Sequence, residues 1–128
     1  MVIQYNDRVL EHFRSPRNVG RMDSADGFGE QVSEICGDHM LLYLKIADGR
    51  ISDINFLSLG CAASIASGSI LTEMVKGKAL QEAERVTTQD IVDALGGLPE
   101  PKIHCSVLAA DCLRKAIEDY RSRLPSSQ

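Results

Sequence analysis

The hydrophobic pattern changes its period once along this chain, and that change limits the fold more than any other feature. From Glu30 to Leu59 the pattern has a period of about two, which is typical of β-strands. After Gly60 the period becomes helical, and a helix is predicted from about Cys61 to Lys76. The apolar positions of the first region are Val32, Ile35, Leu42, Leu44, Ile46, Ile54 and Phe56. Strands followed by helices, with no further strand, indicate an α+β fold.

Short connections between the three expected strands fix how these strands pair. Asp48-Gly49 separates the second strand from the third, and both residue types tolerate the positive φ of a type I′ hairpin turn. The segment Cys36-Gly37-Asp38 is expected to join the first two strands as a turn. We therefore predict a small three-stranded antiparallel sheet with helices packed on one face.

A short helix is expected before the sheet. Asn6 can cap it, Val9, Leu10 and Phe13 share one face, and Pro16 ends it. A loop that contains Gly20, Gly27 and Gly29 is expected to follow this helix.

The second half of the chain predicts further helices. Gly77 should close the helix that begins near Cys61, and Thr88 should cap a short helix up to Leu95. The segment Leu98–Lys102 is expected to be extended, because proline disfavours helix at the residue before it. A long C-terminal helix is predicted from about Ser106 to Arg123.

Composition supports one globular domain, residues 1–128, with a flexible tail at 124–128. The chain has 128 residues, of which 44% are hydrophobic and 25% charged, and no linker-like segment divides it. A net charge of −4 argues against nucleic acid as a partner. No apolar block is long enough for a signal peptide or a membrane span, so we expect a cytoplasmic protein without a membrane partner.

Four cysteines in a reducing compartment favour metal binding or thiol chemistry over disulfides. Cys36 lies in a turn, and Cys61 and Cys105 lie at expected helix starts, where free backbone N–H groups stabilise the thiolate that binds metal. The fourth cysteine, Cys112, lies outside this pattern. Because free cysteines are often simply buried in a core, these three positions alone leave both readings open.

Possible fourth ligands lie close to these cysteines. Asp38 follows Cys36 by two residues and His104 precedes Cys105, while Lys102 can offset the charge of the thiolates. Asp38 is equally a common turn residue. Tyr5 stays open as a core residue, a ligand or a dimer contact. The set is compatible with a tetrahedral zinc site or an iron-sulfur site.

Several motifs, in the right order, give the chain a resemblance to a known family. They are Tyr5 with Val9-Leu10-Glu11-His12, Pro16-Arg17-Asn18-Val19-Gly20, Cys36-Gly37-Asp38, Gly60-Cys61 with Ala66-Ser67, Thr72-Glu73, Gly77-Lys78 and Lys102-Ile103-His104-Cys105-Ser106. Nearly the whole chain thus resembles the U-type iron-sulfur cluster assembly scaffolds, the IscU family, which also forms the N-terminal domain of NifU.

The resemblance implies a scaffold without turnover of its own. Such proteins take sulfur from a cysteine desulfurase, receive iron, build a transient [2Fe-2S] cluster and pass it to apo iron-sulfur acceptor proteins. They also bind Zn²⁺ at the same ligands. By position, Cys36, Cys61 and Cys105 would hold the cluster, Asp38 and His104 would be alternative fourth ligands, and Lys102 would lie beside the site.

Departures and alternatives accompany this resemblance. Members that use a dedicated Hsp70-type chaperone carry Leu-Pro-Pro-Val-Lys, whereas this chain has Leu98-Pro99-Glu100-Pro101-Lys102, so the resemblance does not decide whether such a chaperone is a partner.

The alternative functions are a zinc-dependent persulfide acceptor of the same fold, a purely structural zinc domain, and an enzyme in which His104 activates a nucleophilic Cys105. The short stretch between Cys61 and Cys105, together with His104, argues against the persulfide acceptor.

Overall fold

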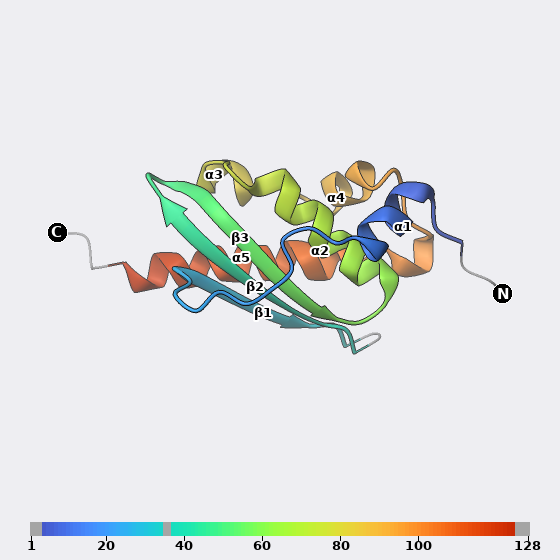
Figure 1. The fold of residues 1–128 in the computed structure, drawn as a ribbon, viewed down its shortest axis with the longest axis horizontal. Coiled ribbons are helices and arrows are strands. Elements are labelled where there is room, and N and C mark those ends of the chain that lie inside the picture. Colours follow the sequence, from blue (N-terminus) through green and yellow to red (C-terminus); the bar gives the residue numbers. More distant parts are fainter. Residues whose placement is uncertain (1–3, 35–36, 125–128) are drawn as a thin grey trace.

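The computed structural model describes residues 4–34 and 37–124. Its strands are β1 (Gly27–Val32), β2 (His39–Ala47) and β3 (Arg50–Leu59), which form one antiparallel sheet in the order β1-β2-β3. Helices follow the sheet in sequence (Figure 1). The predicted α+β class and the three-stranded antiparallel sheet are therefore confirmed.

The hairpin between β2 and β3 has the predicted turn. Asp48 and Gly49 have φ values of +54° and +73°, as a type I′ turn requires. Ala47 and Arg50 flank these two residues and pair directly across the turn. The turn thereby fixes which side chains of both strands point toward the core.

One face of the sheet is covered by two helices. The long C-terminal helix α5 (His104–Arg123) packs on β1 and β2, and α2 (Ala62–Val75) packs on β3, as Figure 1 shows. Alternate strand residues are fully buried beneath them, namely Met40, Leu42, Leu44, Ile54 and Phe56. The sheet therefore has one buried face, as its alternating pattern predicts.

Shorter helices complete the fold: α1 (Asp7–Arg14), α3 (Leu80–Ala83), α4 (Thr88–Ala94) and the 3₁₀ helix η1 (Glu100–Lys102). Asn6 caps α1, as predicted, and its side chain accepts the N–H of Val9. The expected apolar face of α1 is only partly right, because Phe13 is 41% exposed while His12 is buried. A hydrogen bond to α2 compensates the burial of His12.

The expected loop around Gly27 and Gly29 is wrong, because both residues belong to β1. Their buried positions face α5 at very short range: a Cβ atom on Gly29 would lie 2.3 Å from the carbonyl oxygen of Cys112. Only glycine allows this approach of strand and helix. Gly27 and Gly29 therefore allow β1 to pack closely against α5.

Three helix boundaries also differ from the predictions. Thr87 rather than Thr88 caps α4, in a reciprocal capping box with Asp90. The segment Leu98–Lys102 is extended only at its start and then forms η1, since proline is tolerated in the first turn of a helix. Helix α5 begins at His104, two residues before the predicted start.

Two further points concern the chain ends and membranes. Leu124 ends the described chain and is 48% exposed, whereas the rest of the predicted tail, 125–128, lies outside the described residues. Within residues 4–34 and 37–124, none of the helices combines the length and the apolar character needed to cross a bilayer.

Candidate metal centre

Three chain segments bring Asp38, Cys61 and Cys105 together. Asp38 immediately precedes β2, Cys61 is the N-cap residue of α2, and Cys105 lies in the first turn of α5. Cys61 follows β3 and keeps an extended backbone, with φ −79° and ψ 172°. The site thus forms where one end of the sheet meets two helix N-termini, whose dipoles favour negative charge.

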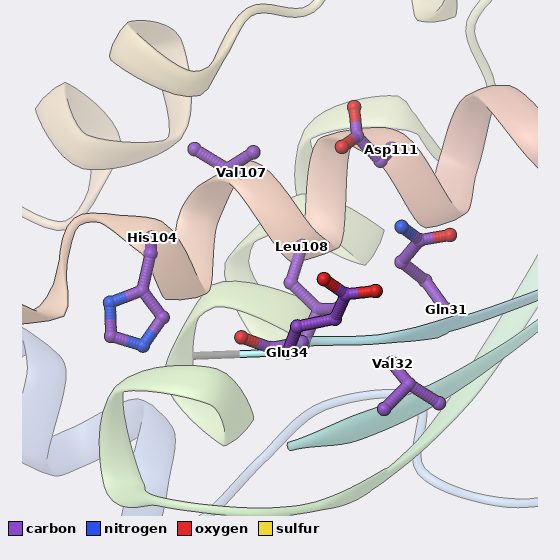
Figure 2. A pocket seen from close by; sticks show the side chains of 8 residues that line it. Gln31, Val32, Glu34, His104, Val107, Leu108 and Asp111 are labelled. Atoms are coloured by element: carbon purple, nitrogen blue, oxygen red, sulfur yellow. The ribbon is translucent and has the colours of Figure 1, made fainter. Parts of the chain in front are cut away.

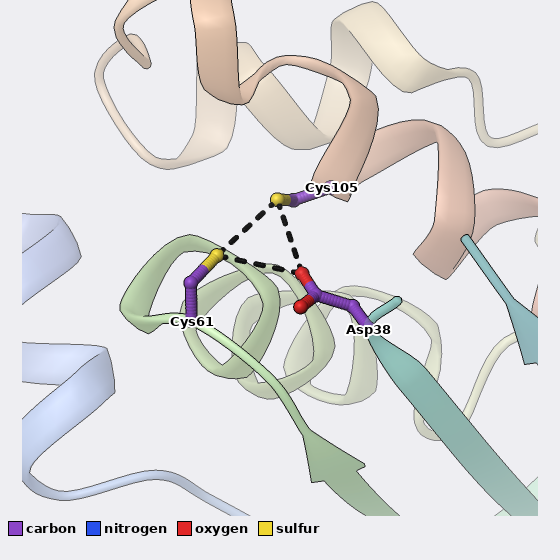
Figure 3. Close-up of side chains that lie close together, drawn as sticks. All are labelled: Asp38, Cys61 and Cys105. Atoms are coloured by element: carbon purple, nitrogen blue, oxygen red, sulfur yellow. Dashed lines mark hydrogen bonds between the residues drawn. The ribbon is translucent and has the colours of Figure 1, made fainter. Parts of the chain in front are cut away.

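The ligand atoms of these residues form a compact triangle (Figure 3). The Sγ atoms of Cys61 and Cys105 are 3.5 Å apart, and Asp38 Oδ2 lies 3.5 Å from Cys61 Sγ and 3.7 Å from Cys105 Sγ. Sulfur and oxygen ligands at about 2.3 and 2.0 Å from one tetrahedral metal would be about 3.5 to 3.8 Å apart. The triangle therefore matches three corners of a tetrahedral site.

Burial shields two of these three residues. Cys105 is fully buried and Asp38 is 5% exposed, whereas Cys61 is partly open to solvent. Gly60 makes room for Asp38, because a Cβ atom there would lie 2.5 Å from Asp38 Cγ. A glycine before Cys61 is therefore required for the carboxylate to reach the sulfurs.

The two thiols of the site differ in acidity. A hydrogen bond from the Cys105 thiol lowers the pKa of Cys61, and the backbone N–H of Ser64 acts in the same direction. The same hydrogen bond and burial raise the pKa of Cys105. Within this hydrogen-bonded pair, negative charge is therefore favoured on Cys61 over Cys105.

The remaining predicted site residues are placed as follows. His104 begins α5, and its Nε2 atom lies 3.7 Å from Cys105 Sγ. Lys102 ends η1, three residues before Cys105. Burial raises the pKa of Tyr5, and the charge of Cys61 adds to this effect, which places the phenol within electrostatic range of the centre. Cys36 lies outside the described residues.

A cavity of about 410 Å³ opens beside His104 (Figure 2). It lies between the end of β1 and the first turns of α5, where Val32, Val107 and Leu108 form apolar walls and Glu34 and Asp111 add carboxylates. None of Asp38, Cys61 and Cys105 lines it. His104 therefore stands between the metal centre and this cavity.

Cys112 is separate from the centre. It is fully buried in the core, and its Sγ–H faces the carbonyl oxygen of Met40 at 3.5 Å. Burial raises the pKa of its thiol to about 12. Among the described residues, the group able to hold a metal consists of Asp38, Cys61 and Cys105, so Cys112 is not part of it.

Sequence reasoning missed Ser64 as a site residue. Its hydroxyl is fully buried, donates a hydrogen bond to Asp38 Oδ2 and lies 3.7 Å from Cys61 Sγ. The one available signal was its spacing of three residues from Cys61, which places both on the first turn of a helix. In a stretch rich in alanine and serine, this spacing does not distinguish Ser64 from its neighbours.

Comparison with known proteins assigns the chain to a family. Residues 4–126 match the family described as the NifU-like N-terminal domain, and the chain belongs to this family. The resemblance inferred from sequence motifs is thereby confirmed.

Named relatives lie within the same group. The chain is 53% identical over 116 residues to the iron-sulfur cluster assembly scaffold protein IscU 1 of Archaeoglobus fulgidus, which covers 91% of this chain and 76% of that protein. It is 46% identical over 123 residues to the iron-sulfur cluster assembly scaffold protein IscU of Escherichia coli K12, covering 93% and 95%.

Solved structures share the architecture. The N-terminal part of a NifU-like protein from Brucella abortus superimposes with a TM-score of 0.74 at 22% identity, covering 93% of this chain and 95% of that one. A chain from Fervidobacterium islandicum AW-1 superimposes with a TM-score of 0.75 at 24% identity, covering 88% and 96%. At these identities the two structures support the fold.

Proposed function

We propose that this protein is a scaffold on which a [2Fe-2S] cluster is assembled and from which the cluster is passed on. The triangle of Asp38 Oδ2 and the sulfurs of Cys61 and Cys105 carries this proposal, because its spacing suits tetrahedral iron. Cys36 is proposed as the third thiolate by its position in the family motif. Relatives named as iron-sulfur cluster assembly scaffolds support the same function.

The donor set favours release of a cluster over permanent storage. Thiolates suit iron in a sulfide cluster, whereas a hard carboxylate such as Asp38 is a weaker match and exchanges more readily. His104 is the proposed alternative fourth ligand, and Lys102 the proposed neighbouring charge. Zn²⁺ is expected to bind the same residues. The protein then acts as a carrier, and the chemistry of sulfur release belongs to a partner.

The proposed partners follow from this role. A cysteine desulfurase would supply sulfur to the partly exposed Cys61 thiolate or its neighbours, and apo iron-sulfur proteins would receive the cluster. Contact of an Hsp70-type chaperone with Leu98–Lys102 is left to experiment, because the sequence departs from the family motif there. Free thiols as ligands require a reducing compartment, and we therefore place the protein in the cytoplasm.

Anaerobic reconstitution with iron and sulfide tests the function. We expect visible charge-transfer absorption and bound iron in the wild type, and loss of both after Cys36→Ser, Cys61→Ser or Cys105→Ser, because iron left with two thiolates is open to water. Cys112→Ser is the matched control and should keep the wild-type spectrum. Wild-type absorption in any of the first three variants would remove that cysteine from the ligand set.

Replacing the proposed labile ligand should affect release. We expect Asp38→Ala to keep its cluster longer in air and to transfer it more slowly to an apo-ferredoxin, because three thiolates remain and His104 can complete the shell. Decay and transfer are followed by visible absorption. Equal rates in both proteins would reduce Asp38 to a turn residue.

A further inference from the structure

The hydroxyl of Ser64 is committed to the oxygen of Asp38 that faces the metal centre. Ser64 lies in the first turn of α2, three residues after Cys61, and is fully buried, so its single proton must find an acceptor inside the protein. That acceptor is Asp38 Oδ2. The same oxygen faces Cys61 Sγ at 3.5 Å and Cys105 Sγ at 3.7 Å.

Contacts on different sides confine the Asp38 carboxylate. The missing Cβ of Gly60 leaves a space that Asp38 fills, since an atom there would lie 2.5 Å from Cγ and 2.6 Å from Oδ1. The Ser64 hydroxyl holds the other oxygen. Burial of a carboxylate is costly unless it is hydrogen-bonded, so this bond helps to keep Asp38 at 5% exposure. Without it, solvent competes for the carboxylate.

We propose that Ser64 is a positioning residue that presents Asp38 Oδ2 to a metal held by Cys61 and Cys105. The inference rests on the proposed function and adds to it a residue that holds the labile ligand in place. Second-shell hydrogen bonds of this kind orient carboxylate ligands and change metal affinity about 10- to 100-fold. Loss of the hydroxyl removes a restraint on Asp38 Oδ2, and we therefore expect the site of Ser64→Ala to resemble that of Asp38→Ala.

A competing role for Ser64 gives a different result. Its hydroxyl also lies 3.7 Å from Cys61 Sγ and could act on this thiolate directly. If Ser64 acts through Asp38, replacing both residues changes the site no more than replacing Asp38 alone. If it acts through Cys61, the two effects add.

The test uses Co²⁺ as a probe of the ligand set, because its ligand-field bands depend on the donor atoms and can be read without a cluster. Titration with Co²⁺ is followed by absorption in the wild type, Ser64→Ala, Asp38→Ala and the double variant. We expect the three variants to share one band pattern, shifted from that of the wild type. Ser64→Thr, which keeps a hydroxyl, should restore the wild-type bands.

Ser67→Ala is the matched control. Ser67 is also fully buried on α2, but its hydroxyl pairs with Ser106 Oγ at 3.1 Å, and we expect its variant to keep the wild-type bands. Circular dichroism is used to check that each variant is folded.

A reconstituted cluster provides a second readout. In air, Ser64→Ala should decay more slowly than wild type, by a factor no larger than that of Asp38→Ala, and the double variant should match Asp38→Ala.

The outcomes separate this inference from the function it rests on. Wild-type bands in Ser64→Ala, or a shift in the double variant equal to the sum of the single shifts, would overturn the role of Ser64 and leave the scaffold function standing. Absence of Co²⁺ binding by the wild type, or binding that survives Cys61→Ser and Cys105→Ser unchanged, would overturn both.

Discussion

At the scale of single residues, the surroundings of Cys61, Cys105 and Cys112 give these cysteines different exposure and different pKa values. Cys61 is partly exposed and its pKa is lowered by the Cys105 thiol, whereas Cys105 is fully buried and its pKa is raised. Cys112 is buried in the core with its pKa raised to about 12. Because the thiolate is the nucleophile, these differences order the reactivity of the three.

We expect iodoacetamide to modify Cys61 of the metal-free protein well before Cys105 and Cys112. Its rate should vary less with pH around neutrality than that of an ordinary thiol, because the lowered pKa of Cys61 increases the thiolate fraction there. Peptide mapping by mass spectrometry measures the three sites in one sample. Earlier modification of Cys105 would contradict the proton arrangement of the pair.

The site residues differ in how far they can be predicted from the sequence. Asp38, Cys61 and Cys105 could be named from family motifs, and the structure brings all three together. Ser64 could not be named, because one serine among small residues carries no signal until folding places it against Asp38. A hydrogen bond between residues 26 positions apart is a property of the tertiary structure.

At the scale of elements, contacts between strands and helices account for the predictions that were wrong. Turn and cap signals are local, so the hairpin at Asp48-Gly49 and the cap at Asn6 were predicted correctly. Local sequence favours a loop at Gly29, because the role of this glycine depends on α5, a helix that begins 75 residues later. The residues around Gly29 do not indicate how closely β1 and α5 pack, so the need for glycine there cannot be predicted from them.

We expect Gly29→Ala to lower the free energy of unfolding by about 1 to 3 kcal/mol, the usual cost of overpacking. The added Cβ would lie 2.3 Å from a backbone oxygen and 2.8 Å from a backbone nitrogen of α5, which have no free rotation to yield. Urea denaturation measures the change. Glu30→Ala, at the next and exposed position of β1, is the control and should cost much less.

Helix α1 is attached to α2 through a buried histidine. His12 Nδ1 lies 2.7 Å from Ser69 Oγ, and Ser69 also accepts the backbone N–H of Arg17. Burial lowers the pKa of His12, and the charge of Arg17 acts in the same direction, against the opposing effects of Glu73 and Glu11. The fold therefore favours neutral His12, whose Nδ1 atom can accept a hydrogen bond from the Ser69 hydroxyl.

The pH dependence follows from this lowered pKa. The unfolded chain binds the proton of His12 more readily, so stability should fall as pH decreases through about 6.5, the ordinary histidine value. We expect His12→Gln to have a flatter dependence of unfolding free energy between about pH 7.5 and 5.5. Phe13→Gln, at the adjacent exposed position, should retain the wild-type slope. An unchanged slope in His12→Gln would show that other groups dominate.

At the scale of the whole molecule, the proposed ligands connect parts of the chain that are distant in sequence. Asp38 precedes the central strand β2, Cys61 is the N-cap residue of the helix packed on β3, and Cys105 lies in the first turn of the helix packed on β1 and β2. A metal ion bound by all three would hold both helix N-termini to one end of the sheet. Since the unfolded chain does not preserve this arrangement, binding should stabilise the native state.

We therefore expect Zn²⁺ to raise the unfolding temperature of the metal-free protein. At a free concentration of about 100 times Kd, the stabilisation is about 2.7 kcal/mol. For a chain of this size, each kcal/mol corresponds to roughly 2 to 8 °C. The shift should vanish in Cys61→Ser and Cys105→Ser and persist in Cys112→Ala, because Cys112 lies in the core outside the ligand group. Scanning calorimetry at neutral pH, with and without Zn²⁺, measures all four proteins. Loss of the shift in a folded Cys112→Ala would show that the ligand set is wrong.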